Sequence, residues 1–117
     1  MKYFDISEFD SPDEVGSGSR MHPSTLQMLD NAREIAGIPF KINSGFRTKS
    51  HNAYIGGSKL SSHLYGYAVD IHCTDSRRRS IILDALSKAG FTRFGIADTF
   101  IHTDNDPDKD QDVLWLY

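Results

Sequence analysis

Several features that restrict what a small protein can be are scarce or absent in this sequence. There is a single cysteine, Cys73, so no disulfide can form within the chain. No apolar run approaches the roughly 18 residues that cross a bilayer, and the first residues lack the apolar stretch of a signal peptide. We therefore expect no membrane span, and we expect synthesis in the cytoplasm without a signal peptide.

Basic residues are too few and too scattered for a nucleic-acid-binding surface. The net charge is -3 at pH 7, whereas such surfaces are strongly and locally basic. The one basic run, residues 77–79, fits the solvated start of a helix. We therefore expect no nucleic-acid partner, and we expect the protein to be a monomer.

The residues that are present predict one α+β domain spanning residues 1–117. Helical spacing of apolar side chains predicts helices from Pro23 to Gly37 and from Asp75 to Gly90. Alternation predicts strands near residues 40–44, 67–73, 91–96, 98–104 and 113–117. Gly16-Ser-Gly-Ser predicts an exposed, flexible loop. We expect a small, mostly antiparallel sheet with helices packed on one face, and Trp115 packed against a helix.

The stretch from Ser61 to Asp70 contains an imidazole and a carboxylate seven residues apart, those of His63 and Asp70. Both groups are normal zinc ligands. Their separation is too long for one face of a helix and fits a loop that turns at Gly66 before a strand. His102, in a later strand-like run, is a candidate third ligand. Taken singly, a histidine is more often a surface residue or a hydrogen-bonded core residue than a metal ligand, and an aspartate after a strand is more often a cap.

The pattern Ser61-x-His63-x-x-Gly66-x-Ala68-x-Asp70 resembles the signature of the M15 zinc peptidases, which include D-Ala-D-Ala carboxypeptidases and related peptidoglycan peptidases. The resemblance implies that His63, Asp70 and His102 bind one zinc ion. It also implies a fold like that of Hedgehog and the D-Ala-D-Ala peptidases. The similarity extends over nearly the whole chain, through Ser44-Gly-Phe-Arg47-Thr, His51-Asn52, Gly56-Gly57, Phe100-Ile-His102-x-Asp104 and Trp115-Leu-Tyr117.

Two further residues are candidates for substrate binding. Arg47 follows a predicted strand at a turn, a common location for binding residues, and a guanidinium can hold a carboxylate through two parallel hydrogen bonds. The resemblance implies that Arg47 anchors the peptide substrate, and we assign Ser61, at the start of the motif, to substrate binding with it. The alternative for Arg47 is a surface salt bridge.

The sequence departs from the M15 pattern at the catalytic carboxylate. Many members carry Glu or Asp three residues before the last His, where this chain has Thr99, and another branch has His two residues before it, where this chain has Phe100. Alternation in the strand predicted over residues 98–104 puts Asp98 on the face of His102, so we predict that Asp98 is the general base. Asp104 is the other candidate, and there we expect a supporting role, orienting an imidazole or Arg47.

The resemblance implies metal-assisted hydrolysis of peptide bonds in peptidoglycan, in stem peptides or cross-links that contain D-amino acids. Carboxypeptidase and endopeptidase activity both remain open. The small size and the missing signal peptide are similar to phage endolysins, so we expect the protein to act on the bacterial cell wall from the periplasm. The alternatives are a non-catalytic zinc-binding module and a structural component of a virion with the same fold.

Overall fold

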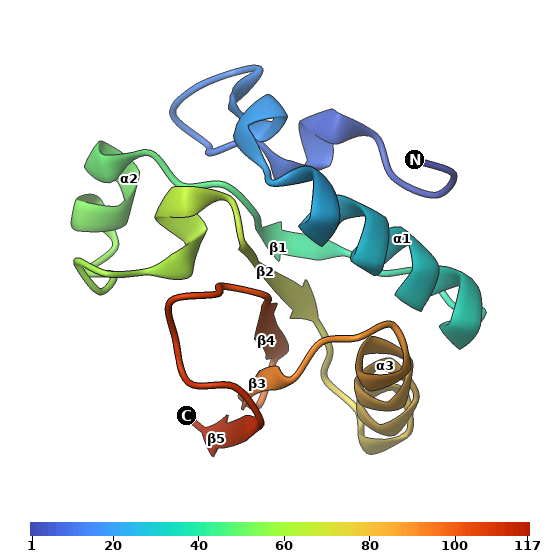
Figure 1. The fold of residues 1–117 in the computed structure, drawn as a ribbon. Helices are drawn as coiled ribbons and strands as arrows, with labels where there is room; N and C mark the ends of the chain where they lie inside the picture. Colours follow the sequence, from blue (N-terminus) through green and yellow to red (C-terminus); the bar gives the residue numbers. More distant parts are fainter.

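A five-stranded sheet forms the centre of the computed structural model, which describes residues 1–117 (Figure 1). Three short 3₁₀ helices accompany the regular elements: η1 (Ile6–Phe9), η2 (Ser17–Arg20) and η3 (Ser62–Tyr65). The α-helices and strands are, in chain order, α1 (Pro23–Ala36), β1 (Ile42–Ser44), α2 (Lys49–Tyr54), β2 (Ala68–His72), α3 (Ser76–Lys88), β3 (Arg93–Ile96), β4 (Phe100–Asp104) and β5 (Val113–Leu116).

The strands lie in the order β1-β2-β4-β3-β5. The first three pairs are antiparallel, and β5 is added to β3 in parallel at the edge of the sheet. In the β2–β4 pair, Asp70 lies opposite His102 and Ala68 lies opposite Asp104. The prediction of an α+β fold with a mostly antiparallel sheet is therefore confirmed.

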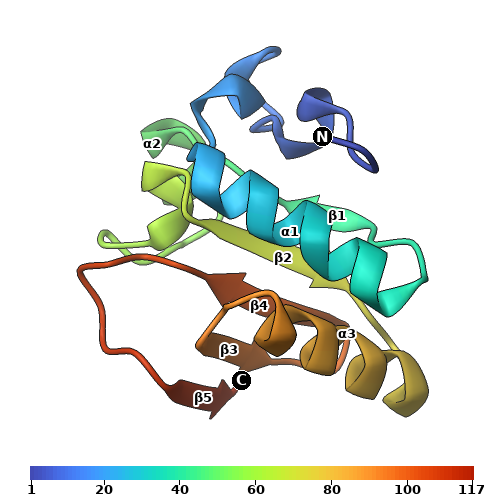
Figure 2. The ribbon, with the colours of Figure 1, turned by 45° about the vertical axis from the view of Figure 1, so that its right-hand side comes forward.

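The two long helices, α1 and α3, pack side by side against one face of the sheet (Figure 2). Val69, Ile71 and Ile101 are fully buried in the core that these helices cover. Because successive side chains of a strand point to opposite faces, Asp70 and His102 lie on the face away from the core. One face of the sheet thus holds the fold together, and the other carries the polar groups.

Local signals set the ends of both helices. Pro23 is the first residue of α1, and Gly37 ends that helix in the left-handed conformation at φ 68°. The Asp75 carboxylate caps α3 by accepting a hydrogen bond from the Arg78 N–H at 3.0 Å. Neither helix combines the length and apolar character needed to span a bilayer.

The first 20 residues differ from the expectation of a flexible loop at Gly16-Ser-Gly-Ser. That prediction is wrong, because residues 17–20 form η2, in which Gly18 is buried. The Asp10 carboxylate accepts hydrogen bonds from the N–H groups of Gly16 and Gly18, at 3.0 and 2.7 Å. A Cβ atom at Gly18 would lie 2.3 Å from the Ile6 carbonyl oxygen, so glycine permits close packing there.

Candidate metal centre

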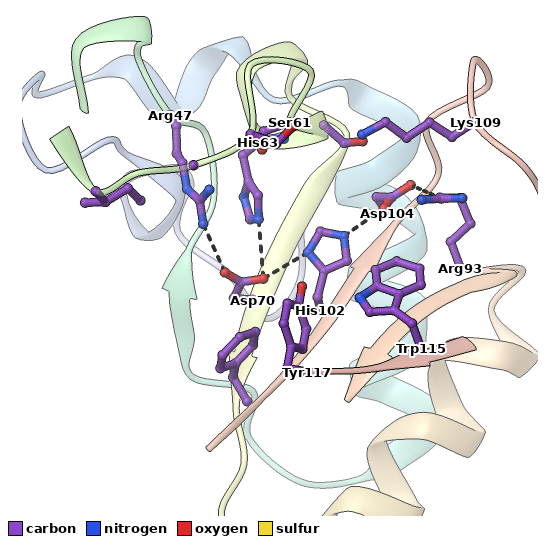
Figure 3. A pocket seen from close by; sticks show the side chains of 15 residues that line it. Arg47, Ser61, His63, Asp70, Arg93, His102, Asp104, Lys109, Trp115 and Tyr117 are labelled. Atoms are coloured by element: carbon purple, nitrogen blue, oxygen red, sulfur yellow. Dashed lines mark hydrogen bonds and ion pairs between the residues drawn. The ribbon is translucent and has the colours of Figure 1, made fainter. Parts of the chain in front are cut away.

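A cleft of about 430 Å³ opens over the polar face of the sheet (Figure 3). Its floor is formed by Asp70 of β2 and His102 of β4, and His63 of η3 enters it from the side. All three side chains are buried, and one ligand atom from each can be chosen so that the three lie within 4.8 Å of one another. The structure therefore brings together the three residues expected to bind a metal ion.

Hydrogen bonds within the preceding loop hold His63 in place. The Ser61 hydroxyl accepts a hydrogen bond from the His63 N–H at 3.3 Å and caps η3. The helix ends at Gly66, whose φ of 77° is left-handed. A Cβ atom at this position would lie 2.4 Å from the Arg20 carbonyl oxygen, so a glycine is required for both reasons. The turn sends the chain directly into β2 and towards Asp70.

The ring of His63 is oriented by the backbone. Its Nδ1 lies 2.8 Å from the Gly45 carbonyl oxygen, which can only accept, so Nδ1 carries the hydrogen. Nε2 therefore presents a lone pair. It lies 3.3 Å from Asp70 Oδ1, and it is buried without a hydrogen-bond partner. A buried polar atom without a partner is unfavourable unless a bound ligand interacts with it.

His102 is oriented by a second carboxylate. Its Nε2 lies 2.7 Å from Asp104 Oδ2, and its Nδ1 lies 3.0 Å from Asp70 Oδ1. Asp104 is itself almost fully buried and is held by the Arg93 Nε–H at 2.7 Å. Because the Asp104 carboxylate accepts the Nε2 hydrogen, a neutral His102 presents its Nδ1 lone pair to Asp70.

With these orientations, the ring nitrogens and the carboxylate form a set of ligand atoms that suits a metal cation. In the neutral state, His63 Nε2 and His102 Nδ1 both direct lone pairs at Asp70 Oδ1, with no hydrogen between them. The contact becomes favourable when a proton or a metal ion stands between these atoms. Two imidazole nitrogens and a carboxylate oxygen are the donor set of zinc sites that keep a further position open. The residues therefore fit a zinc ion.

The pKa values in the group follow from burial and from these contacts. Burial lowers the pKa of His63 below its ordinary value, which favours the neutral ring that a metal requires. Burial also disfavours charge on His102, but hydrogen bonds to Asp104 and Asp70 outweigh it and raise the pKa of that ring. Burial would raise the pKa of Asp70, yet the two imidazoles hold it well below its usual range. Asp70 is therefore ionised.

Both residues expected to bind substrate line the cleft. Arg47 donates to Ser44 Oγ at 3.0 Å, to Asn52 Oδ1 at 3.3 Å and to Asp70 Oδ2 at 3.2 Å. A guanidinium has five N–H groups, so one hydrogen remains on each terminal nitrogen. Ser61 lies beside His63 in the wall and already serves as the cap of η3.

Asp98 is not brought into this group, and its expected place in the strand is corrected. The strand β4 begins at Phe100, and Asp98 lies in the exposed turn before it. The Asp98 carbonyl accepts a hydrogen bond from Arg79 of α3 at 3.2 Å, on the helix side of the sheet. The alternation of side chains counted back from His102 does not apply to Asp98, because β4 begins only at Phe100. The general-base role predicted for Asp98 has no support in this arrangement.

The sequence analysis gave no site role to several residues that line the cleft, among them Arg93, Lys109, Trp115 and Tyr117. The expectation that Trp115 packs against a helix is wrong. Its ring lies 5.5 Å from that of His102 and 5.2 Å from the Arg93 guanidinium. The alternation of residues 113–117 predicts that Trp115 and Tyr117 lie on the same side of their strand. It does not predict which face of the sheet that side belongs to. Lys109 comes from an irregular loop and had no signal.

Comparison with known families gives a match over most of the chain. A family model described as Peptidase M15 matches residues 2–104, a range that includes all three members of the group and ends before β5. No curated protein matches the chain at a significant level.

Proposed function

The chain belongs to the peptidase M15 family, and from this premise we propose that it is a zinc-dependent peptidase of bacterial peptidoglycan. The bonds cleaved are those of stem peptides or cross-links that contain D-amino acids. We further propose that it serves as a lysin of the phage type, which reaches the wall from the periplasm after synthesis in the cytoplasm.

One observation carries the zinc assignment. When both rings are neutral, the ring nitrogens that face Asp70 are the ones left without hydrogens, since the Gly45 carbonyl and the Asp104 carboxylate accept the hydrogens at the opposite ends of the two rings. A hydrogen-bonded core histidine pair would place a donor opposite each acceptor. Here His63 Nε2 has no hydrogen-bond partner at all. A bound zinc ion would supply a Lewis acid at the floor of the cleft and a source of hydroxide near neutral pH.

The chain's own residues hold and orient the peptide. Arg47 lines the cleft and keeps two N–H hydrogens, with which it can bind a carboxylate or a carbonyl oxygen of the substrate. Arg47 is only 13% exposed in its side chain and is fixed by Asp70 and Asn52. A fixed guanidinium orients a substrate without a large loss of side-chain entropy on binding.

A proton donor for the leaving amine is also present. The hydroxyl of Tyr117 points towards Asp70 and His102 (Figure 3). Partial burial raises the pKa of Tyr117 above its ordinary value, so the phenol keeps its proton. We assign proton donation to Tyr117 because Asp98 lies outside the cleft, and Asp104 is engaged by His102 and Arg93.

Incubation of purified peptidoglycan with the chain tests this function. We expect zinc-loaded protein to clear peptidoglycan in a zymogram and to release peptides that mass spectrometry can identify. Loss of a terminal D-amino acid would establish a carboxypeptidase, and cleavage at an internal bond would establish an endopeptidase. Removal of zinc by a chelator should abolish clearing, and added zinc should restore it. Zinc-loaded protein that releases nothing at any pH would overturn the proposal.

The departure at Thr99 favours a second candidate, a non-catalytic zinc-binding module. No carboxylate other than those of Asp70 and Asp104 lines the cleft, and both are engaged by imidazoles. A module of this kind would bind zinc and peptidoglycan peptides without releasing a product. A structural component of a virion would bind zinc without binding those peptides. The same incubation, followed by co-sedimentation with peptidoglycan, separates the three cases.

A further inference from the structure

A second and larger cavity, which we call the basic groove, lies next to the cleft. It has a volume of about 750 Å³ and runs between η2, α2 and the loop before η3. Arg47 and Gly57 line both the cleft and the groove. A ligand that lies over the metal centre can therefore continue into the groove past Arg47.

The charge of the groove is opposite to that of the molecule. The chain carries a net charge of -3, yet the groove is lined by four cationic side chains and one acidic side chain. The acid, Glu14, already forms an ion pair with Arg20. Lys49 and Lys59 are exposed and form no ion pair. The groove thus presents two free ammonium groups in addition to Arg47.

Apolar and aromatic side chains also line the groove. Phe46 is buried in its wall, and the Arg20 guanidinium lies 5.3 Å from the centre of that ring. Leu64 and Tyr65 also line the groove, and Tyr65 is 58% exposed. Charged groups beside exposed carbon surface suit a peptide with acidic side groups better than they suit a free inorganic ion.

A thin partition separates the groove from the cleft. The Asn52 amide accepts a hydrogen bond from Arg47 at 3.3 Å and donates one to the Ser58 carbonyl at 2.9 Å. A Cβ atom at Gly57 would lie 2.1 Å from Asn52 Oδ1, so the loop passes directly over this amide. The partition fixes Arg47 at the boundary between the two cavities.

We infer that the basic groove binds an acidic segment of the peptide substrate, with carboxylates of the segment near Lys49 and Lys59. The inference rests on the proposed function and adds its substrate class: peptides that carry a free carboxylate several bonds away from the cleaved bond. Peptides in which that carboxylate is an amide should bind less well. Long-range attraction should also make binding to the acidic peptides weaken with added salt.

Two matched peptides test the inference. Both have the sequence of a peptidoglycan stem peptide, and they differ in whether the free side carboxylate is present or replaced by a carboxamide. Binding of each dye-labelled peptide is measured by fluorescence anisotropy with a chelator present, so that no cleavage occurs. We expect the acidic peptide to bind the chain more tightly than the amide.

The variant K49Q/K59Q should lose about three- to tenfold in affinity for the acidic peptide and little for the amide, as expected for partly exposed charge pairs. The control K41Q/K88Q removes the same charge from exposed sites outside the groove. It should bind both peptides as the unmodified chain does. Equal affinity for the two peptides, or an equal loss in both variants, would overturn the inference.

Failure of the inference and failure of the proposed function give different results. If zinc-loaded protein cleaves the acidic and amidated peptides with the same kcat/KM, the peptidase stands and the groove assignment fails. If neither peptide is cleaved but the acidic one still binds more tightly through Lys49 and Lys59, the groove assignment stands and the peptidase fails.

Discussion

At the scale of single residues, the two imidazoles of the centre owe their orientation to groups that no metal ion would touch. A backbone carbonyl, that of Gly45, sets the tautomer of His63, and the Asp104 carboxylate sets that of His102. Asp104 is in turn fixed by Arg93 and by the Asp106 N–H at 3.2 Å. The donor atoms of the centre are therefore positioned before any ion arrives.

Replacement of Asp104 by asparagine should weaken zinc binding. The neutral amide holds the Nε2 hydrogen of His102 less strongly and leaves the buried Arg93 without its counter-charge. We expect a loss of about 10–100-fold in zinc affinity, measured by competition with a chromophoric chelator. D108N, an exposed change in the following loop, is the matched control and should bind zinc normally. Unchanged affinity in D104N would show that Asp104 does not orient the ligand.

Replacement of Tyr117 by phenylalanine should slow the reaction without removing the metal. Removing the hydroxyl takes away the proposed proton donor, so we expect kcat to fall by about 100-fold while KM and zinc content stay close to those of the unmodified chain. D98A serves as a comparison and should retain activity, since Asp98 lies in an exposed turn. A fall in D98A with full activity in Y117F would return the catalytic role to Asp98.

At the scale of elements, the centre depends on how η3 joins β2. The turn at Gly66 is the only link between the helix that carries His63 and the strand that carries Asp70. The backbone there is left-handed and also packs against Arg20. Two ligands of the centre are thus set by the conformation of one residue that binds nothing.

Alanine at Gly66 and at Gly56 should have different effects. Both glycines have similar left-handed φ angles, 77° and 74°, but a Cβ atom meets the Arg20 carbonyl at Gly66 and nothing within 4 Å at Gly56. We expect G56A to lower the free energy of unfolding by about 1 kcal/mol from strain alone. G66A should lower the free energy of unfolding by about 1–3 kcal/mol more than G56A does. It should also bind zinc more weakly. Urea denaturation measures both, and equal losses would contradict the packing argument.

Local chemistry explains which elements were predictable. Pro23, Gly37 and Asp75 act within one turn of the helices they delimit, so the sequence predicts α1 and α3 closely. The place of Trp115 was not predictable, because β5 adds to β3 from across a loop and its face is set by that pairing. Asp98 was misplaced because alternation says nothing about where a strand begins. The His63–Asp70–His102 group was found because its residues form a specific motif.

At the scale of the whole molecule, the centre joins segments far apart in the chain. His63 comes from η3, and Asp70 and His102 come from β2 and β4, whose pairing holds the middle of the sheet. An ion bound by all three stabilises only the folded state, because the unfolded chain does not keep them together. Zinc binding should therefore be visible as thermal stability.

Zinc should raise the melting temperature markedly. At free zinc about 100 times Kd, binding adds about 2.7 kcal/mol, which corresponds to a rise in Tm of about 10 °C for a chain of this size. Differential scanning calorimetry measures the shift. The variant D70N should show almost no rise, and magnesium should not replace zinc because the donors include two imidazoles. An equal rise in D70N would place the ion elsewhere.

The edge strand β5 supplies Trp115 to the cleft and leads directly into Tyr117, yet no residue from 113 to 117 is fully buried. Its side chains are therefore free to change with little penalty to folding, while the floor of the cleft is bound to the core through β2 and β4. This wall of the cleft and the residues that hold the scaffold together therefore lie in separate parts of the chain. Randomisation of residues 113–116, with Tyr117 kept, should consequently yield mostly well-folded variants with altered preferences.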